Sequence, residues 1–337
     1  MGAPLVPLND LTQIDRYIAA GAEELYMGFY DPSWNAAFGP YADLNRMSGF
    51  GTEANAYTLE NVMWAAGAVA ARGRRLYVTF NTAAYGADKS GCVVRYFSLL
   101  ASAGAAGVIL SGPEFMDAAK ECGLQVVAST MCAVYNHQIA AFYRDCGADR
   151  IILPRDLSLA DIRAIVDGLA QTAPEGAAPM EYEVFCMRNG CVFSDSHCLG
   201  MHGMGRGALC GEIRVGARKL RSSQDVGALR ENSDVWCRSF HTHACGLCAL
   251  WDFEQMGISA YKVVGRGDMS DAIAEDTQLI TDELAIARNC STREEYLRRM
   301  RPHPYAEQVC VRGLNCYYPE SRRVVGDGAE DAPSEGG

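Results

Sequence analysis

Short apolar runs alternate with amphipathic, helix-length segments along the first 270 residues of the chain. Eight of these runs have the length and the apolar content that are typical of strands buried on both faces. They are Pro4–Pro7, Glu24–Gly28, Leu76–Phe80, Gly107–Leu110, Leu124–Ala128, Arg150–Leu153, Glu181–Phe185 and Ala260–Val264. The predicted helices between them are Asp10–Ala20, Thr58–Ala71, Val94–Ala103, Pro113–Cys122, Asn136–Cys146 and Ser158–Gly168.

This alternation predicts an α/β fold, and the strand count of eight favours a (β/α)8 TIM-type barrel. An open, doubly wound sheet gives the same alternation and is the alternative. We expect the barrel over residues 1–270, with a cysteine-rich insertion at 187–248 after the seventh strand. A helical extension at 271–321 and a disordered tail at 322–337, rich in Gly, Glu, Asp and Ser, complete the expected organisation.

Seven of the fourteen cysteines lie between Cys186 and Cys248, and all but Cys186 belong to the insertion. Four thiolates can hold a [4Fe–4S] cluster or a structural zinc ion. Zinc ribbons commonly use two Cys-x-x-Cys pairs, whereas only Cys245 and Cys248 form such a pair in this region. The dispersed spacing of the others favours the cluster, with zinc as the runner-up and unligated redox thiols as a third interpretation.

Charge and hydropathy restrict the partners. The net charge of −11 argues against broad affinity for nucleic acid, whereas basic residues concentrated in the cysteine region suit an anionic small molecule. No apolar run approaches the roughly 18 residues of a membrane span, and the N-terminus lacks the pattern of a signal peptide. We therefore expect a cytoplasmic protein.

Barrels of this kind place their chemistry at the carboxyl ends of the strands. The polar residues at these ends, together with one arginine of the insertion, are the candidate site. The catalytic candidates are Asn81, Arg155 and Lys262, and the candidates for substrate binding are Arg206, Arg266, Ser111 and Ser129. Arginines at these positions can bind a carboxylate or a phosphate in bidentate fashion.

Five segments occur in an order that resembles the collagenase-like peptidase family U-32 over about residues 1–270. They are Gly21–Gly28, Tyr77–Thr82, Arg150–Ser158, Glu183–Cys198 and Lys262–Arg266. The resemblance implies a barrel fold and a [4Fe–4S] cluster. By position it nominates four ligands, Cys191, Cys198, Cys210 and Cys248, with Cys245 as the close competitor for the fourth place. The chain departs from the family where Asp195 and Ser196 replace a Ser-Gly pair.

Several members of that family resemble oxygen-independent hydroxylation proteins that act on the ubiquinone ring or on RNA bases. The resemblance therefore implies redox or hydroxylation chemistry on an anionic small molecule or an aromatic or nucleobase substrate, in an anaerobic setting. A collagenase-like peptidase is the alternative that the family label suggests. A third hypothesis is a non-catalytic metal-binding subunit that acts with a partner protein or a homologous subunit, for which Cys310 and Cys316 could serve.

Overall fold

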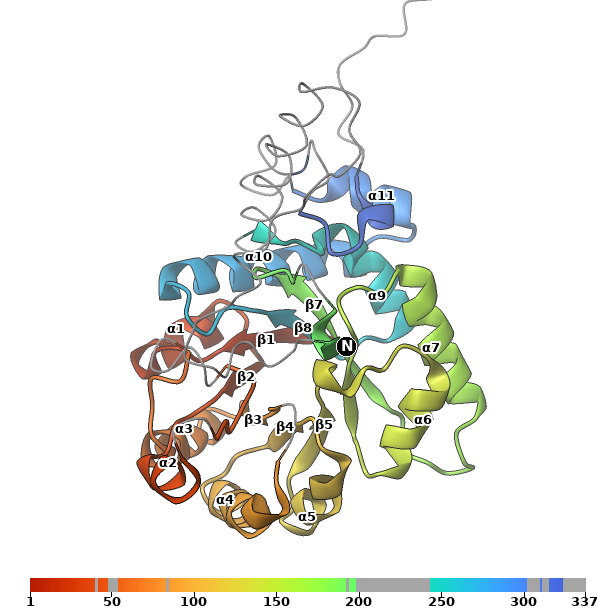
Figure 1. The fold of residues 1–337 in the computed structure, drawn as a ribbon. Helices are drawn as coiled ribbons and strands as arrows, with labels where there is room; N and C mark the ends of the chain where they lie inside the picture. Colours follow the sequence, from red (N-terminus) through yellow and green to blue (C-terminus); the bar gives the residue numbers. More distant parts are fainter. Residues whose placement is uncertain are drawn as a thin grey trace, which may run out of the picture.

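Eight parallel strands close into a barrel in the computed structural model of the chain (Figure 1). The structure describes residues 1–39, 42–47, 54–82, 85–191, 194–197, 243–301, 310 and 315–323. The strands are β1 (Ala3–Pro7), β2 (Glu24–Met27), β3 (Arg75–Phe80), β4 (Gly107–Leu110), β5 (Gln125–Ala128), β6 (Arg150–Ile152), β7 (Glu181–Met187) and β8 (Ala260–Val263).

Strand β1 closes the barrel because it pairs with both β2 and β8. Leu5 lies opposite Glu24 on one side and opposite Lys262 on the other, and both pairings are parallel. The prediction of a (β/α)8 barrel is confirmed, and the open sheet is excluded because an open sheet would leave β1 or β8 with an unpaired edge.

Most of the helices lie between the strands in sequence and surround the barrel, and α10 and α11 follow the last strand (Figure 1). They are α1 (Ile14–Ala19), α2 (Pro32–Phe38), α3 (Leu59–Ala70), α4 (Ser90–Ser102), α5 (Met116–Glu121), α6 (His137–Asp145), α7 (Leu159–Gln171), α9 (Leu250–Met256), α10 (Ser270–Arg288) and α11 (Arg293–Arg299). Among the described helices, none is both long enough and apolar enough to cross a membrane.

Local sequence explains why the helices begin where they do. Ser158 caps α7, because its Oγ accepts from the backbone N–H of Asp161 at 3.2 Å while the Asp161 carboxylate accepts from the Ser158 N–H at 3.1 Å. Asp31 caps α2 and Pro32 stands in its first turn. This short helix lies in the connection after β2.

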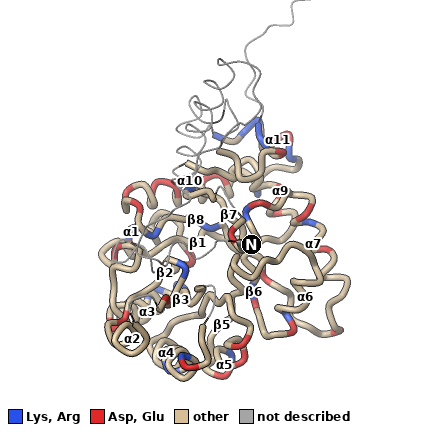
Figure 2. Tube along the Cα trace, in the orientation of Figure 1, with Lys and Arg blue, Asp and Glu red and all other residues tan. Residues whose placement is uncertain are grey.

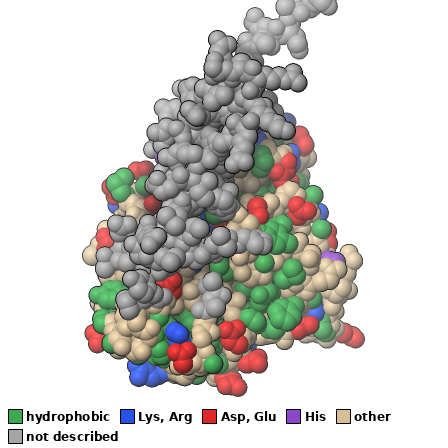
Figure 3. All heavy atoms as spheres, in the orientation of Figure 1, with side chains coloured by type: hydrophobic (Ala, Val, Ile, Leu, Met, Phe, Trp, Pro, Cys, Tyr) green, Lys and Arg blue, Asp and Glu red, His purple; other side chains and the backbone are tan. Residues whose placement is uncertain are grey.

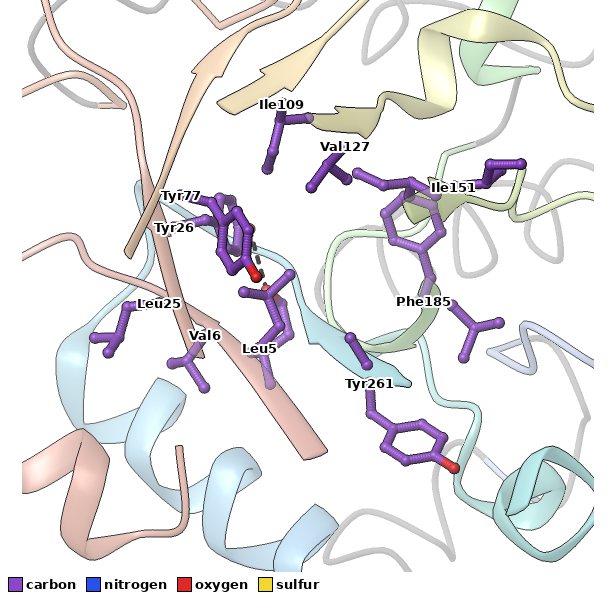
Figure 4. Close-up of a cluster of buried hydrophobic side chains, with 14 of the residues drawn as sticks. Leu5, Val6, Leu25, Tyr26, Tyr77, Ile109, Val127, Ile151, Phe185 and Tyr261 are labelled. Carbon is purple, nitrogen blue, oxygen red and sulfur yellow. Dashed lines mark hydrogen bonds between the residues drawn. The ribbon is translucent and has the colours of Figure 1, made fainter. Parts of the chain in front are cut away.

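Side chains alternate between the barrel interior and the layer beneath the helices, as the period of two in a strand requires. Figure 4 shows Leu5 and Tyr26 on different sides of their strands from Val6 and Leu25. All four side chains are buried, so both layers are packed.

A fully buried arginine crosses the interior. Arg150 on β6 donates to both carboxylate oxygens of Glu24 on β2, at 2.5 and 2.8 Å, and its Nε donates to Glu181 at 2.8 Å. The guanidinium also lies 5.1 Å from the centre of the Tyr77 ring. Burying these charges is tolerable because each is paired and hydrogen-bonded.

Replacing this arginine is expected to destabilise the folded barrel. Arg150→Leu removes the bidentate partner of the buried Glu24 carboxylate and leaves it only the half-exposed Arg75, so the free energy of unfolding should fall by about 3 kcal/mol. Urea denaturation followed by circular dichroism measures it. The matched control is Arg301→Gln, because the side chain of Arg301 is 61% exposed in its ion pair with Asp282, and such pairs contribute about 1 kcal/mol or less. Equal losses in the two variants would contradict a special role for the interior pair.

Candidate substrate site at the barrel mouth

The carboxyl ends of the strands gather most of the predicted site residues at one end of the barrel. Asn81 follows β3, Ser111 follows β4, Ser129 follows β5, Arg155 comes after β6 and Arg266 comes after β8. Parallel strands share one direction, so these positions meet at the same mouth. The exceptions are Lys262, which lies within β8, and Arg206 of the insertion, which lies outside the described residues.

Arg266 is buried at this mouth, and its described partners are neutral. Its Nη1 donates to Asn55 Oδ1 and to Thr79 Oγ1, each at 3.1 Å, and its Nη2 donates to Asn45 Oδ1 at 3.3 Å. In the part of the chain that the structure describes, no carboxylate forms an ion pair with Arg266. Burial lowers the pKa of Arg266 to about 10; Tyr26 opposes this change and the positive charge of Arg46 adds to it. A buried cation with neutral partners favours an anion that completes its pairing.

The space for this arginine depends on a glycine at the end of β2. A Cβ atom on Gly28 would stand 2.2 Å from Arg266 Nη1 and 2.2 Å from Asn55 Oδ1. Both distances are far shorter than any real contact, so only glycine lets the guanidinium and the amide meet there.

A second group of charges surrounds Asp195, which is fully buried. One carboxylate oxygen accepts from Arg155 Nε at 2.6 Å and from Thr130 Oγ1 at 3.2 Å, and the other accepts from Arg46 Nη1 at 2.6 Å. Burial tends to raise the pKa of Asp195, but the nearby Arg155 and Arg46 outweigh it and hold the pKa below its usual value. Two guanidinium groups share one carboxylate, so this group adds positive charge to the mouth.

Arg155 is held in place by an aromatic ring as well as by Asp195. Its guanidinium carbon lies 3.9 Å from the centre of the Phe185 ring on β7, a cation–π geometry. With the Nε bond to Asp195, this contact fixes the plane of the guanidinium.

Lys262 lies deeper than the arginines, within β8. Its Nζ donates to Glu183 Oε1 at 2.6 Å and lies 3.9 Å from the centre of the Tyr26 ring. Burial lowers the pKa of Lys262, and the neighbouring Glu183 carboxylate opposes that shift. The Lys262 ammonium group thus already has a carboxylate partner. The catalytic role predicted for Lys262 stays a prediction.

The neutral candidate residues lie at the same mouth of the barrel. Asn81 Nδ2 donates to Ser129 Oγ at 3.2 Å, and Asn81 Oδ1 accepts from the backbone N–H of Arg46 at 3.2 Å. The Ser111 hydroxyl donates to the backbone carbonyl of Thr82. Asn81 and Ser129 thus lie together beside the arginine-rich loop, whereas Ser111 is engaged with the backbone.

The predicted metal ligands are only partly described. Cys198 and Cys210 lie outside the described residues. Cys191, which follows β7, is half-buried, and its charge would act on Arg155 and Tyr317. Cys248 and its competitor Cys245 lie just before α9. Among the residues that the structure describes, no group of three or more His, Cys, Asp or Glu side chains is arranged to hold a metal ion.

Besides the buried Asp195, Glu24 and Glu183, many acidic residues lie on the outer elements. Figure 2 shows them along helices such as α5 and α10, where they include Asp117, Glu121, Asp271 and Asp282. On the face drawn in Figure 3, the described Lys and Arg side chains appear in small separate groups among acidic and hydrophobic ones. This distribution fits a protein whose positive charge gathers at a local site.

Comparisons with known proteins give one family and two relatives. The family model described as peptidase family U32 matches residues 9–321. An uncharacterized protease of Methanocaldococcus jannaschii is 30% identical over 287 residues, which is 83% of this chain and 64% of the relative. The tRNA hydroxylation protein P1 of Bacillus subtilis is 23% identical over 188 residues, 54% of this chain and 40% of the relative. The chain therefore spans less than two thirds of the length of either curated relative.

One of the similar solved structures is a U32 peptidase, at 12% identity and a TM-score of 0.48. The match covers 78% of this chain and 93% of that one.

Removing the carboxylate that Arg155 and Arg46 share should lower the free energy of unfolding in a pH-dependent way. Asp195→Asn leaves two arginines facing each other, so the free energy of unfolding at pH 7 should fall by about 3–5 kcal/mol. A carboxyl with a lowered folded pKa stabilises the protein above its unfolded value of about 3.9, and this stabilisation is lost as the pH falls through the folded pKa. The difference between wild type and variant should therefore shrink below about pH 4.

Chemical denaturation between about pH 3 and pH 7 tests this dependence. Asp167→Asn is the control, because Asp167 is exposed on α7. A difference that stays constant over the whole range would show that Asp195 is not ionised between the arginines.

Proposed function

The chain belongs to peptidase family U32, and we propose that it is an iron–sulfur enzyme that performs oxygen-independent hydroxylation, or a related redox reaction, on an anionic substrate at the barrel mouth. The observation that carries the proposal is the buried guanidinium of Arg266, whose described partners are all neutral and whose neighbour is a second arginine, Arg46. A carboxylate or phosphate group would supply the missing countercharge.

Arginine side chains would bind the anionic group, and neutral side chains at the barrel mouth would orient the rest of the substrate. Arg266 would bind the anionic group through its fork of N–H donors. Arg155 and Arg46, held by Asp195, would keep the surrounding potential positive. Asn81 and Ser129 would offer hydrogen bonds to the neutral part of the substrate, which we assign to the small anionic, aromatic or nucleobase class.

The cysteines provide the argument for an iron–sulfur cluster. Cys191 follows β7 on the same mouth, beside the positive Arg155, a setting that favours a thiolate. We propose Cys198 and Cys210 of the insertion as further ligands. The fourth thiolate is assigned by the family resemblance to Cys248, with Cys245 as the alternative. A bound cluster supplies one-electron redox or Lewis-acid chemistry.

The relatives support different chemistries. The Bacillus subtilis relative is named as a tRNA hydroxylation protein, which supports hydroxylation-like chemistry. The Methanocaldococcus jannaschii relative is named as a protease, which makes peptide hydrolysis the second candidate. The peptidase would be favoured if iron-free protein digests casein and the Cys191→Ser variant does not. A chain that becomes active only with a second protein from its host would favour a metal-binding subunit.

Anion binding at Arg266 can be measured without knowing the natural substrate. Inorganic phosphate and benzoate serve as probes in isothermal titration calorimetry. Arg266→Gln should weaken binding by about tenfold to a hundredfold, since hydrogen bonds to charged groups contribute about 1.5–3 kcal/mol.

Two further variants make this test specific. Gly28→Ala retains every charge but crowds the guanidinium, so it should weaken binding too. Arg72→Gln removes an exposed arginine that pairs with Asp15 and should bind like wild type. Equal affinities in Arg266→Gln and Arg72→Gln would refute the assignment of the anion site.

Iron and sulfide analysis tests the proposed cluster separately from anion binding. Anaerobically purified protein should be brown and contain about four irons and four sulfides that depend on the insertion. Cys191→Ala and Cys198→Ala should each lose this iron, whereas Cys92→Ala, a change on the outer helix α4, should retain it. A colourless wild-type protein that contains zinc and no iron would reject the redox mechanism.

A further inference from the structure

Lys262 lies one step beneath Arg266 in the barrel interior. Tyr26 on β2 points into this interior (Figure 4), and the centre of its ring is 3.9 Å from Lys262 Nζ. Two residues later, a Cβ atom on Gly28 would stand 2.2 Å from Arg266 Nη1. Residues two apart along a strand share one face and are separated by about 7 Å. The face of β2 that leaves room for Arg266 at the mouth therefore contacts the Lys262 ammonium group just below it.

Glu183 on β7 is the one carboxylate that pairs with Lys262 among the described residues. Its Oε1 accepts from Lys262 Nζ at 2.6 Å, and its side chain is fully buried. Its other oxygen, Oε2, is also buried and has no hydrogen-bond partner in the part of the chain that the structure describes. The hydrogen bonding of this carboxylate is therefore directed at Lys262.

Arg150, the next cation toward the bottom of the barrel, has closer partners of its own. Its Nη1 lies 3.7 Å from Glu183 Oε2, whereas its guanidinium donates to both oxygens of Glu24 at 2.5 and 2.8 Å. Glu24 stands two residues before Tyr26 on β2, so Arg150 lies one step beneath Lys262. The ammonium group is thus held between two guanidinium groups, with Glu183 as its described countercharge.

The neighbouring charges have opposite effects on the Lys262 proton. Burial lowers the pKa of Lys262, and the Glu183 carboxylate opposes that change. The positive charges of Arg266 and Arg150 lower the pKa further. An anion bound to Arg266 would cancel one of these two repulsions, so it would strengthen proton binding by Lys262.

The remaining described neighbours of Lys262 add no charge. Burial raises the pKa of Tyr26, so this ring stays neutral. On the adjacent strands, Leu5 of β1 and Phe185 of β7 stand opposite Lys262 in register. The charge of Lys262 therefore depends on its carboxylate partner and on the guanidinium groups above and below it.

We propose that Glu183 is a positioning residue of the anion site: it holds a charged Lys262 beneath Arg266, so that the proton on Lys262 and the anion on Arg266 stabilise each other. The inference rests on the proposed function, because it takes Arg266 as the group that binds the anion. Such coupling is reciprocal, since the anion strengthens proton binding by the same factor as the proton strengthens anion binding. The proton is taken up from the solvent when the anion binds.

NMR of the lysine side chains measures this coupling in the unaltered chain. The sequence contains four lysines, Lys89, Lys120, Lys219 and Lys262, so isotopic labelling of lysine gives a spectrum that one Lys262→Arg variant assigns. Benzoate is the probe, because a carboxylate stays ionised at neutral and alkaline pH. Saturating benzoate should raise the midpoint of the Lys262 titration, by about one pH unit for each tenfold of coupling. Lys120, which pairs with Asp149 at the surface, should keep its midpoint.

The pH dependence of benzoate binding tests the role of Glu183. In the wild type, the affinity measured by calorimetry should fall as the pH rises through the Lys262 titration. Glu183→Gln removes the carboxylate partner, so this fall should move to lower pH by about one pH unit or more. A carboxylate that only supports the fold would change the affinity without moving the profile.

Three further variants make the profile specific. Glu183→Asp retains the charge on a shorter side chain, so its profile should lie between those of wild type and Glu183→Gln. Lys262→Met should lose the lysine step and keep the loss of affinity that Arg266 causes, because burial lowers the pKa of Arg266 to about 10. Glu283→Gln is the matched control: Glu283 is equally buried, on α10, and its profile should coincide with that of wild type.

The outcomes separate this inference from the proposed function. Benzoate binding that is lost in Arg266→Gln, together with a Lys262 midpoint that benzoate does not move, overturns the coupling and retains the anion site. Unmoved profiles in Glu183→Gln and Glu183→Asp overturn the role of Glu183, and the aspartate variant alone decides if the glutamine variant does not fold. Wild-type protein that binds no benzoate, or binds it as Arg266→Gln does, refutes the anion site and the coupling with it.

Discussion

Pairing of β1 with β8 is the constraint on which the rest of the structure depends. It joins the first strand to the last one described, and so places Arg266, after β8, beside Asn45 and Asn55 in the connection after β2. These residues are far apart in sequence and share no local signal. Closure of the barrel turns them into the two sides of one buried site, and Gly28 leaves room for them to meet.

Inside the closed barrel, compensation of positive charge decreases toward the mouth. Arg150 has three carboxylate partners, Glu24, Glu181 and Glu183, and Lys262 has one, Glu183. Arg155 and Arg46 share the single carboxylate of Asp195.

Arg266, at the end of this series, has only neutral partners among the described residues. A stable interior needs each buried charge to be paired, so the lower pairs explain stability, whereas a buried cation without a carboxylate partner among the described residues supports the proposed anion site.

The sequence predicted the parts of the site that belong to regular structure. Asn81, Ser129, Arg155 and Arg266 were found because strand ends follow from hydrophobic runs, and the ends of parallel strands meet. Their partners Arg46 and Asn55 could not be found, because they lie in a long connection whose path is set by tertiary contacts.

Asp195 was noticed only as a departure from a family pattern. Its function as the shared partner of two arginines depends on the fold of the insertion, not on spacing.

The cysteines show the same division between local and tertiary information. Sequence spacing identifies the Cys245–Cys248 pair, but only the β-bridge between Cys245 and Cys316 reveals that Cys316 lies beside this pair.

This bridge also connects the C-terminal segment to the mouth. Tyr317, next to Cys316, donates to the Arg188 carbonyl, and its ring centre lies 6.1 Å from that of Phe185. Phe185 in turn lies under the guanidinium of Arg155. The packing of the segment around Cys316 therefore also helps to fix the ring that holds Arg155. The order of the C-terminal segment and the proposed anion site at the mouth would therefore depend on the same packed side chains.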